Sequence, residues 1–175
     1  MSLPMLSGTV GGTVCDSGIN EVGDRTEHEE YTTSEANELT CYLYTADCSG
    51  TFGLAYFSHQ GTAGVWVKVC VYSDDGDSIP DAGDSLVGCS TGDAVSTDGW
   101  QTLTGAIGGS SILNSPYWVC HVGNAQIAYH RTSTGVRTLY GLVNSGWYAT
   151  PPSTLVGSWS TTASRDRSTY VVIGP

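Results

Sequence analysis

The sequence predicts an all-β protein: an antiparallel two-sheet sandwich of the jelly-roll kind. Valines occupy every second position from Val65 to Val71, which is the period of a strand with one buried face. Short β-branched and aromatic segments recur along the chain between turn-forming residues, and no segment sustains a helical period. Eight to ten such strands without a helix indicate two packed antiparallel sheets.

The chain is expected to begin with a glycine-rich extended arm over residues 1–14, followed by one sandwich domain over residues 15–175. At this length, a single domain can bury roughly 70% of its unfolded surface. The arm is able to add a strand to a neighbouring subunit, although a frayed terminus is equally consistent with its sequence. Its expected assembly contacts are Leu3, Pro4, Val10 and Val14.

Within the domain, residues 15–38 are polar and acidic and are expected to form a loop or short edge strands. The strands expected after them cover residues 39–45, 52–57, 65–72, 85–89, 100–103, 117–122, 125–131, 138–143 and 169–173. In the first of these strands, the apolar odd positions from Leu39 to Leu43 form the expected core face. Asp98-Gly99 is a tight-turn signal, and residues 144–160 are expected to form a loop rich in tryptophan and proline.

The net charge of −11 argues against nucleic acid as a partner, because phosphate binding requires a basic surface. No stretch approaches the roughly 20 apolar residues of a membrane span, and the first residues lack a signal-peptide pattern. Residues 1–98 carry a balance of −14 and residues 99–175 a balance of +3. Such asymmetry favours packing against copies of the chain or a charged lattice, or it is ordinary solubility charge.

Six cysteines are present, and none has the Cys-X2-Cys spacing of a zinc or redox motif. Cys70 and Cys120 lie within expected strands, where a free cysteine behaves as a small apolar residue. Cys41 and Cys48 flank an expected turn and are the best local candidates for a disulfide, if the protein matures in an oxidising compartment.

From residue 60 onward the order of segments resembles a diffuse group of jelly-roll modules. The resemblance lies in Val69-Cys70-Val71-Tyr72, an Asp/Gly/Pro loop, Asp84-Ser85-Leu86-Val87-Gly88, Gly99-Trp100 and Tyr117-Trp118-Val119. These modules occur in phage virion proteins and in bacterial extracellular multi-domain proteins. The resemblance implies a sandwich used for assembly or binding, with Trp118 as a core anchor, and it implies no catalytic residues.

An acidic loop is the first candidate site. Five aspartates fall within eleven residues, and calcium prefers six to eight oxygen ligands. The spacing fails the EF-hand pattern, so a solvated loop without a metal is the alternative interpretation. The candidate calcium ligands are Asp74, Asp75, Asp77, Asp81 and Asp84.

Aromatic residues in the 144–160 loop are the second candidate site. Trp147, Tyr148 and Trp159 lie among Gly, Pro and Ser, where aromatic rings are able to stack on a sugar. The alternative is that the three rings cover an end of the sandwich.

No catalytic motif is present: the nucleophile elbow Gly-X-Ser-X-Gly is missing, and the four histidines lie in unrelated contexts. The expected function is that of a non-enzymatic virion protein of a tailed phage. The grounds are the leaderless start, the sandwich pattern, the glycine-rich arm, the single lysine and the charge asymmetry. It would act as a capsid decoration or tail accessory that forms homo-oligomers, such as trimers, and binds capsid or tail proteins. The alternative is a carbohydrate-binding or adhesive module of an extracellular protein. No cofactor is expected, and calcium in the acidic loop is the alternative.

Overall fold

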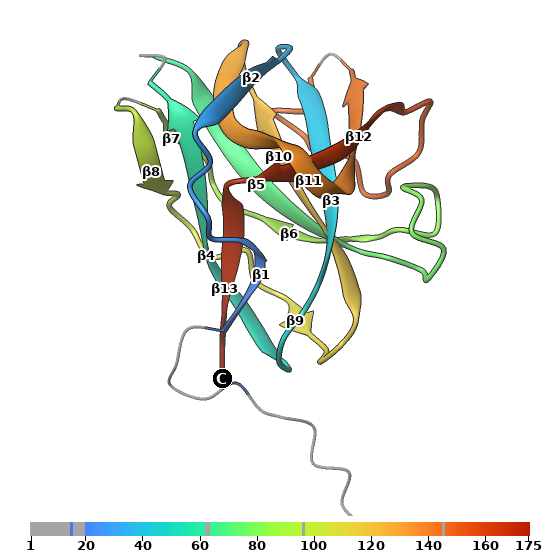
Figure 1. Cartoon of the computed structure of the whole chain (residues 1–175). Coiled ribbons are helices and arrows are strands. Elements are labelled where there is room, and N and C mark those ends of the chain that lie inside the picture. Colours follow the sequence, from blue (N-terminus) through green and yellow to red (C-terminus); the bar gives the residue numbers. More distant parts are fainter. Residues whose placement is uncertain (1–14, 16–19, 62–63, 96, 145) are drawn as a thin grey trace, which may run out of the picture.

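The computed structural model describes residues 15, 20–61, 64–95, 97–144 and 146–175. The arm expected over residues 1–14, with Leu3, Pro4, Val10 and Val14, lies outside the described residues. The described part contains thirteen strands and no helix (Figure 1). They are β1 (Asn20–Asp24), β2 (Glu30–Ser34), β3 (Glu38–Thr45), β4 (Gly50–Gln60), β5 (Trp66–Ser73), β6 (Leu86–Cys89), β7 (Asp93–Ala94), β8 (Gly99–Thr102), β9 (Ser110–Ser111), β10 (Pro116–Gly123), β11 (Ile127–Val143), β12 (Ser160–Arg167) and β13 (Thr169–Gly174).

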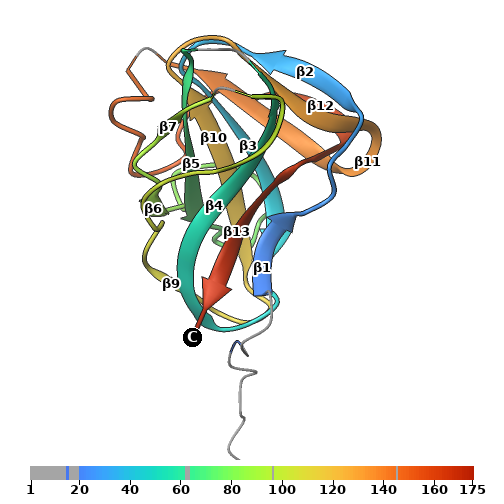
Figure 2. The ribbon, with the colours of Figure 1, turned by 90° about the vertical axis from the view of Figure 1, so that its left-hand side faces the viewer.

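The strands form two antiparallel sheets that pack against each other, which confirms the predicted sandwich. The first sheet contains β1, β13 and β4, with β8 and β9 along the far edge of β4. The second contains β3, β10 and β5, with β6 and β7 along the far edge of β5. Figure 2 shows β1, β13 and β4 in front of β3, β10 and β5. The strand β11 belongs to both sheets, because its first residues pair with β2 and β4 and its last residues pair with β3.

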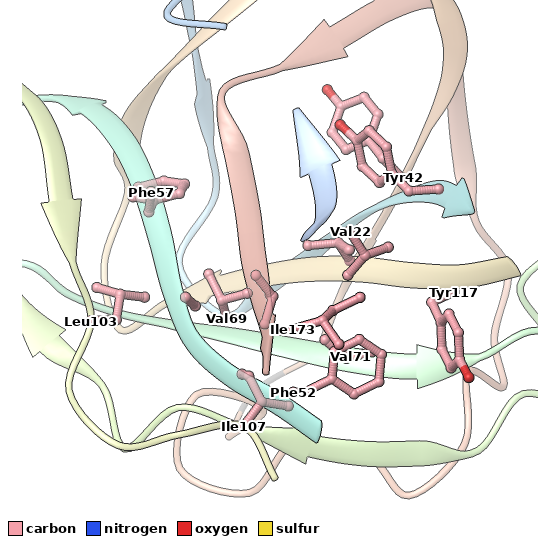
Figure 3. Packing of buried hydrophobic residues seen from close by; sticks show 14 of the residues in the cluster. Val22, Tyr42, Phe52, Phe57, Val69, Val71, Leu103, Ile107, Tyr117 and Ile173 are labelled. Carbon is pink, nitrogen blue, oxygen red and sulfur yellow. The ribbon is translucent and has the colours of Figure 1, made fainter. Parts of the chain in front are cut away.

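The main core lies between the sheets, and Figure 3 shows side chains from both layers meeting there. Phe52 and Ile173 come from the first sheet, and Val69 and Val71 come from the second. The predicted alternation in β5 is confirmed, since its valines face this core and are fully buried. Burying each such side chain contributes about 1.5–3 kcal/mol to folding.

The outer face of the second sheet carries a second apolar cluster. Trp118, the predicted core anchor, is fully buried there together with Leu39 and Leu155. Strand alternation explains the arrangement, because Tyr42 and Tyr44 of β3 face the main core while Leu39 and Cys41 face outward. The expected core face of β3 is thus buried, but in the second cluster and not between the sheets.

Two strand predictions were wrong. The expected strands at 125–131 and 138–143 are one continuous strand, β11, whose pairing with β12 shifts register twice. Residues 160–167 form β12, although this polar segment was not expected to be a strand. Residues 132–137, which join the two expected strands, and residues 160–167 both lack the alternating apolar pattern of a half-buried strand. Both segments belong to the pairing of β11 with β12.

The predicted Cys41–Cys48 disulfide was also wrong. Cys48 pairs with Cys15, Cys41 with Cys120 and Cys70 with Cys89. Local spacing favoured the wrong partner because sheet register, not sequence distance, determines which cysteines meet. Cys70 and Cys120, expected to be free, are both cross-linked.

Four of the cysteines form one row across the second sheet. In the strand registers, Cys41 lies opposite Cys120, Cys120 opposite Cys70, and Cys70 opposite Cys89. The two disulfides therefore join β3 to β10 and β5 to β6 at directly opposed residues, which fixes both pairings in register.

Removing a disulfide should lower the free energy of unfolding, and the loss should increase with the logarithm of the number of residues in the loop that the disulfide closes. The Cys41–Cys120 bridge spans 79 residues and the Cys70–Cys89 bridge spans 19. Chain entropy then assigns a loss of about 4.5 kcal/mol to the double alanine variant of the first pair and about 3 kcal/mol to that of the second. Urea unfolding of both variants measures the difference. A larger loss for the shorter loop would contradict the entropic account.

Candidate functional site

The acidic loop connects β5 to β6 and projects from the side of the sandwich, as the green loop at the right of Figure 1. Asp84 is fully buried at its base. Its carboxylate accepts a hydrogen bond from the backbone N–H of Asp75 at 3.2 Å and another from that of Asp81 at 3.0 Å. The loop is therefore folded around the Asp84 side chain.

Three of the five predicted calcium ligands come together. Carboxylate oxygens of Asp75, Asp81 and Asp84 all lie within 4.8 Å of one another. Asp74 and Asp77 are not part of this group, and each accepts a hydrogen bond from the backbone N–H two residues further along. Three convergent carboxylates supply three of the six to eight oxygen ligands of a calcium ion, and backbone carbonyls or water would complete the shell.

A glycine makes room for one of these carboxylates. A Cβ atom on Gly83 would lie 2.1 Å from Asp75 Oδ2, well inside contact distance. Any side chain at position 83 would displace the Asp75 carboxylate, so the loop depends on this glycine.

Burial changes the ionisation of the central carboxylate. Desolvation raises the pKa of Asp84 to about 6, and the two backbone hydrogen bonds only partly oppose it. Neighbouring Asp74 and Asp81 raise the pKa further through charge repulsion. A cation placed between the three carboxylates would favour the ionised form, so calcium binding and Asp84 ionisation should be coupled.

We expect calcium to stabilise the protein at neutral pH. Excess calcium added to chelated protein should raise Tm by several degrees, because the ion binds the folded loop and not the unfolded chain. Asp84→Asn should abolish this shift, while Asp77→Asn should leave it intact because Asp77 lies outside the three-carboxylate group. Scanning calorimetry measures all three proteins. An unchanged Tm of the native chain would contradict a calcium site.

Without calcium, stability should depend on the ionisation of Asp84. The pKa is raised in the folded state, so the folded protein binds more protons than the unfolded chain between pH 4 and the folded pKa of about 6. The free energy of unfolding should therefore fall as pH rises through this window and level off above it. Asp84→Asn should lose this part of the pH dependence in urea titrations. An identical slope in both proteins would show that Asp84 titrates normally.

The aromatic loop covers the second cluster. Trp147, Tyr148 and Trp159 are half-buried and pack against the cluster that contains Trp118 and Leu155. The indole N–H of Trp159 donates to the carbonyl of Leu155 at 3.1 Å. The Tyr148 ring also lies beneath the ammonium group of Lys68, 4.9 Å from the ring centroid. Glycan binding by these three rings remains a prediction, and their packing gives them a structural role as well.

The histidines do not assemble a catalytic group. Ser34 Oγ and His121 Nε2 lie 3.3 Å apart, but both side chains are buried. His121 Nδ1 has no hydrogen-bond partner in the described structure, so no third group orients the ring as in a catalytic triad. His130 bonds to the His28 carbonyl and to Asp98.

Sequence reasoning missed two arginines that lie opposite each other in the pairing of β11 with β12, Arg131 and Arg167. Arg167 is 1% exposed, and none of its three guanidinium nitrogens has a hydrogen-bond partner. Its guanidinium carbon lies 4.3 Å from the Tyr129 ring centroid and 4.7 Å from that of Phe57. Desolvation lowers the pKa of Arg167 to about 9, and the aromatic faces take the place of hydrogen bonds as its partners. Neither arginine lies in a recognisable motif, so no local signal marks them.

No protein-family model matches the chain, and the search of curated proteins found no match either.

Proposed function

We propose that this chain is a non-enzymatic binding module of an extracellular or surface-exposed protein. One observation carries the proposal: all six cysteines are paired in three disulfides. Disulfides form and persist in oxidising compartments and are rare in the cytosol. A domain of this size can fold on its hydrophobic core alone. Its cross-links therefore suit a module that must stay folded outside the cell.

The distribution of polar groups supports binding rather than catalysis. The buried Ser34–His121 pair has no access to a substrate and no carboxylate to orient the ring. The two surface features that collect polar side chains are the acidic loop and a cavity beside β11, and both suit reversible contacts. Loops on a rigid sandwich are the usual location of such contacts.

A structural protein of a phage virion, bound to capsid or tail proteins as a homo-oligomer, is the second candidate. One observation favours it: β1 is an edge strand in the described sheet and pairs on one side only, with β13. An open edge is a site where a neighbouring subunit adds a strand. We place this role second because a phage virion protein folds in the cytosol, where thiols are kept reduced, so its disulfides would form only on the released particle.

Oxidation state separates the two candidates. We expect chain exported to the bacterial periplasm to carry three disulfides, so that all six cysteines resist alkylation. We expect chain made in the cytosol to have free thiols and a Tm lower by about 10 °C or more, because each missing bridge lowers the free energy of unfolding. Mass spectrometry after alkylation and scanning calorimetry give the two readouts. A reduced cytosolic protein of equal stability would contradict the extracellular assignment.

A further inference from the structure

A polar cavity of about 300 Å³ lies beside β11, where this strand passes from one sheet to the other. Its walls come from β2, β3, β11 and β12, which meet at the upper end of the sandwich in Figures 1 and 2. The mouth of a β-structure is a common location for a ligand. The lining residues are Thr32, Thr33, Glu38, Tyr129, Arg131, Ser160 and Thr162.

Arg131 lines the cavity and carries buried donors that lack acceptors. Arg131 Nε and Nη1 are buried and have no hydrogen-bond partner in the described structure. Nη1 lies 3.6 Å from Glu30 Oε2, so the two form an ion pair without a hydrogen bond. A buried donor left unbonded costs about 1–3 kcal/mol, so a hydroxyl group that accepts from Arg131 would stabilise the site.

Tyr129, one of the lining residues, is held in place by the buried side chains around it. Tyr129 is 2% exposed, and its ring lies over the guanidinium group of Arg167, itself buried between Tyr129 and Phe57. Contacts with Arg167 and with the His121 ring, whose centroid lies 4.7 Å from that of Tyr129, hold the Tyr129 ring in place. Arg131 lies two residues further along β11 and therefore on the same face of the strand. The cavity is therefore formed before any ligand arrives, which lowers the entropic cost of binding.

An acceptor lies in the same cavity. Glu38 Oε2 accepts a hydrogen bond from the backbone N–H of Glu35 at 2.7 Å. A Cβ atom at Gly141 would lie 2.4 Å from Glu38 Oε1, so glycine at this position leaves the second oxygen its space. The threonine and serine hydroxyls of the lining both donate and accept.

These groups select the chemistry of the ligand. An anion would be repelled by Glu30 and Glu38, and a cation would be repelled by Arg131. An apolar ligand would leave the Arg131 donors without acceptors. A ligand whose every polar group both donates and accepts satisfies the cavity, and the hydroxyls of a neutral sugar have this property. The volume is at the small end of the range for ligand pockets, which suits one sugar ring.

We propose that this cavity binds a neutral sugar unit, with Arg131 donating to its hydroxyls and Glu38 accepting from them. The inference rests on the proposed role as a binding module and names its ligand class. It places the sugar beside β11 and not on the aromatic loop that contains Trp147.

The test is a glycan array followed by calorimetric titration of the bound sugar into four oxidised proteins: native, Arg131→Met, Thr162→Val and Thr102→Val. Arg131→Met keeps the apolar stem and removes the donors, and we expect a 10- to 100-fold weaker Kd. Thr162→Val removes one hydroxyl at nearly constant volume and should weaken binding several-fold. Thr102, an exposed residue of β8 outside the cavity, provides the matched control and should leave Kd unchanged.

Two outcomes would overturn the inference. One is native affinity in both cavity variants together with loss of binding in Trp147→Ala, which would place the sugar on the aromatic loop. The other is a folded native protein that binds no neutral glycan. The proposed function is tested separately by the alkylation of the cysteines, so either outcome leaves it standing. If Arg131→Met lowers Tm, Thr162→Val decides the result, since its change is confined to a single hydroxyl.

Discussion

The register of the second sheet is the constraint on which the rest of the structure depends. It aligns Cys41, Cys120, Cys70 and Cys89 in one row, so that two bridges fasten four neighbouring strands in two pairs. A slip of one residue in any of these strands would turn its cysteine to the opposite face, and a slip in β5 would also turn its valines out of the main core. The same register places Trp118 and Tyr72 on the outer face, where residues 146–159 cover them. The disulfides, the main core and the outer cluster therefore all depend on the register of these strands.

The sequence predicts those features of the fold that depend on neighbouring residues, and it fails for those that depend on contacts between distant strands. The alternation of β5 is local, and it correctly indicated a strand with valines in the core. Disulfide partners are a property of register between distant strands, so a six-residue separation was misleading for Cys41 and Cys48. The strand β12 is polar, and it forms through its pairing with β11, so its own sequence has no apolar period that would predict it. The period of apolar residues predicts which face of a segment is buried, whereas the pairing of a strand depends on residues elsewhere in the chain.

The candidate sites follow the same division. The aspartates of the acidic loop are close in sequence, and sequence reasoning identified the loop although only three of the five converge. The cavity beside β11 draws Thr32, Glu38, Arg131 and Thr162 from four strands, and none of these residues is unusual in its own segment. What distinguishes Arg131 is the absence of a partner for buried donors, a property that exists only once the chain is folded.

The bridge between Cys15 and Cys48 also determines how the module would carry mechanical load. The start of β1 and the end of β13 are antiparallel neighbours, with Asn20 opposite Ile173, so tension on the two flanking chains would act at one end of the molecule. Force entering ahead of Cys15 passes through sulfur directly to Cys48 and thence to β4. Because the disulfide carries the force from Cys15 to Cys48, residues 16–47 bear no tension, and these residues include all of β1, β2 and β3. The hydrogen bonds between β1 and β13 would therefore not be broken one after another by the applied force. Residues 16–47 would also not add to the extended length of the chain, because the Cys15–Cys48 bridge closes them into a loop.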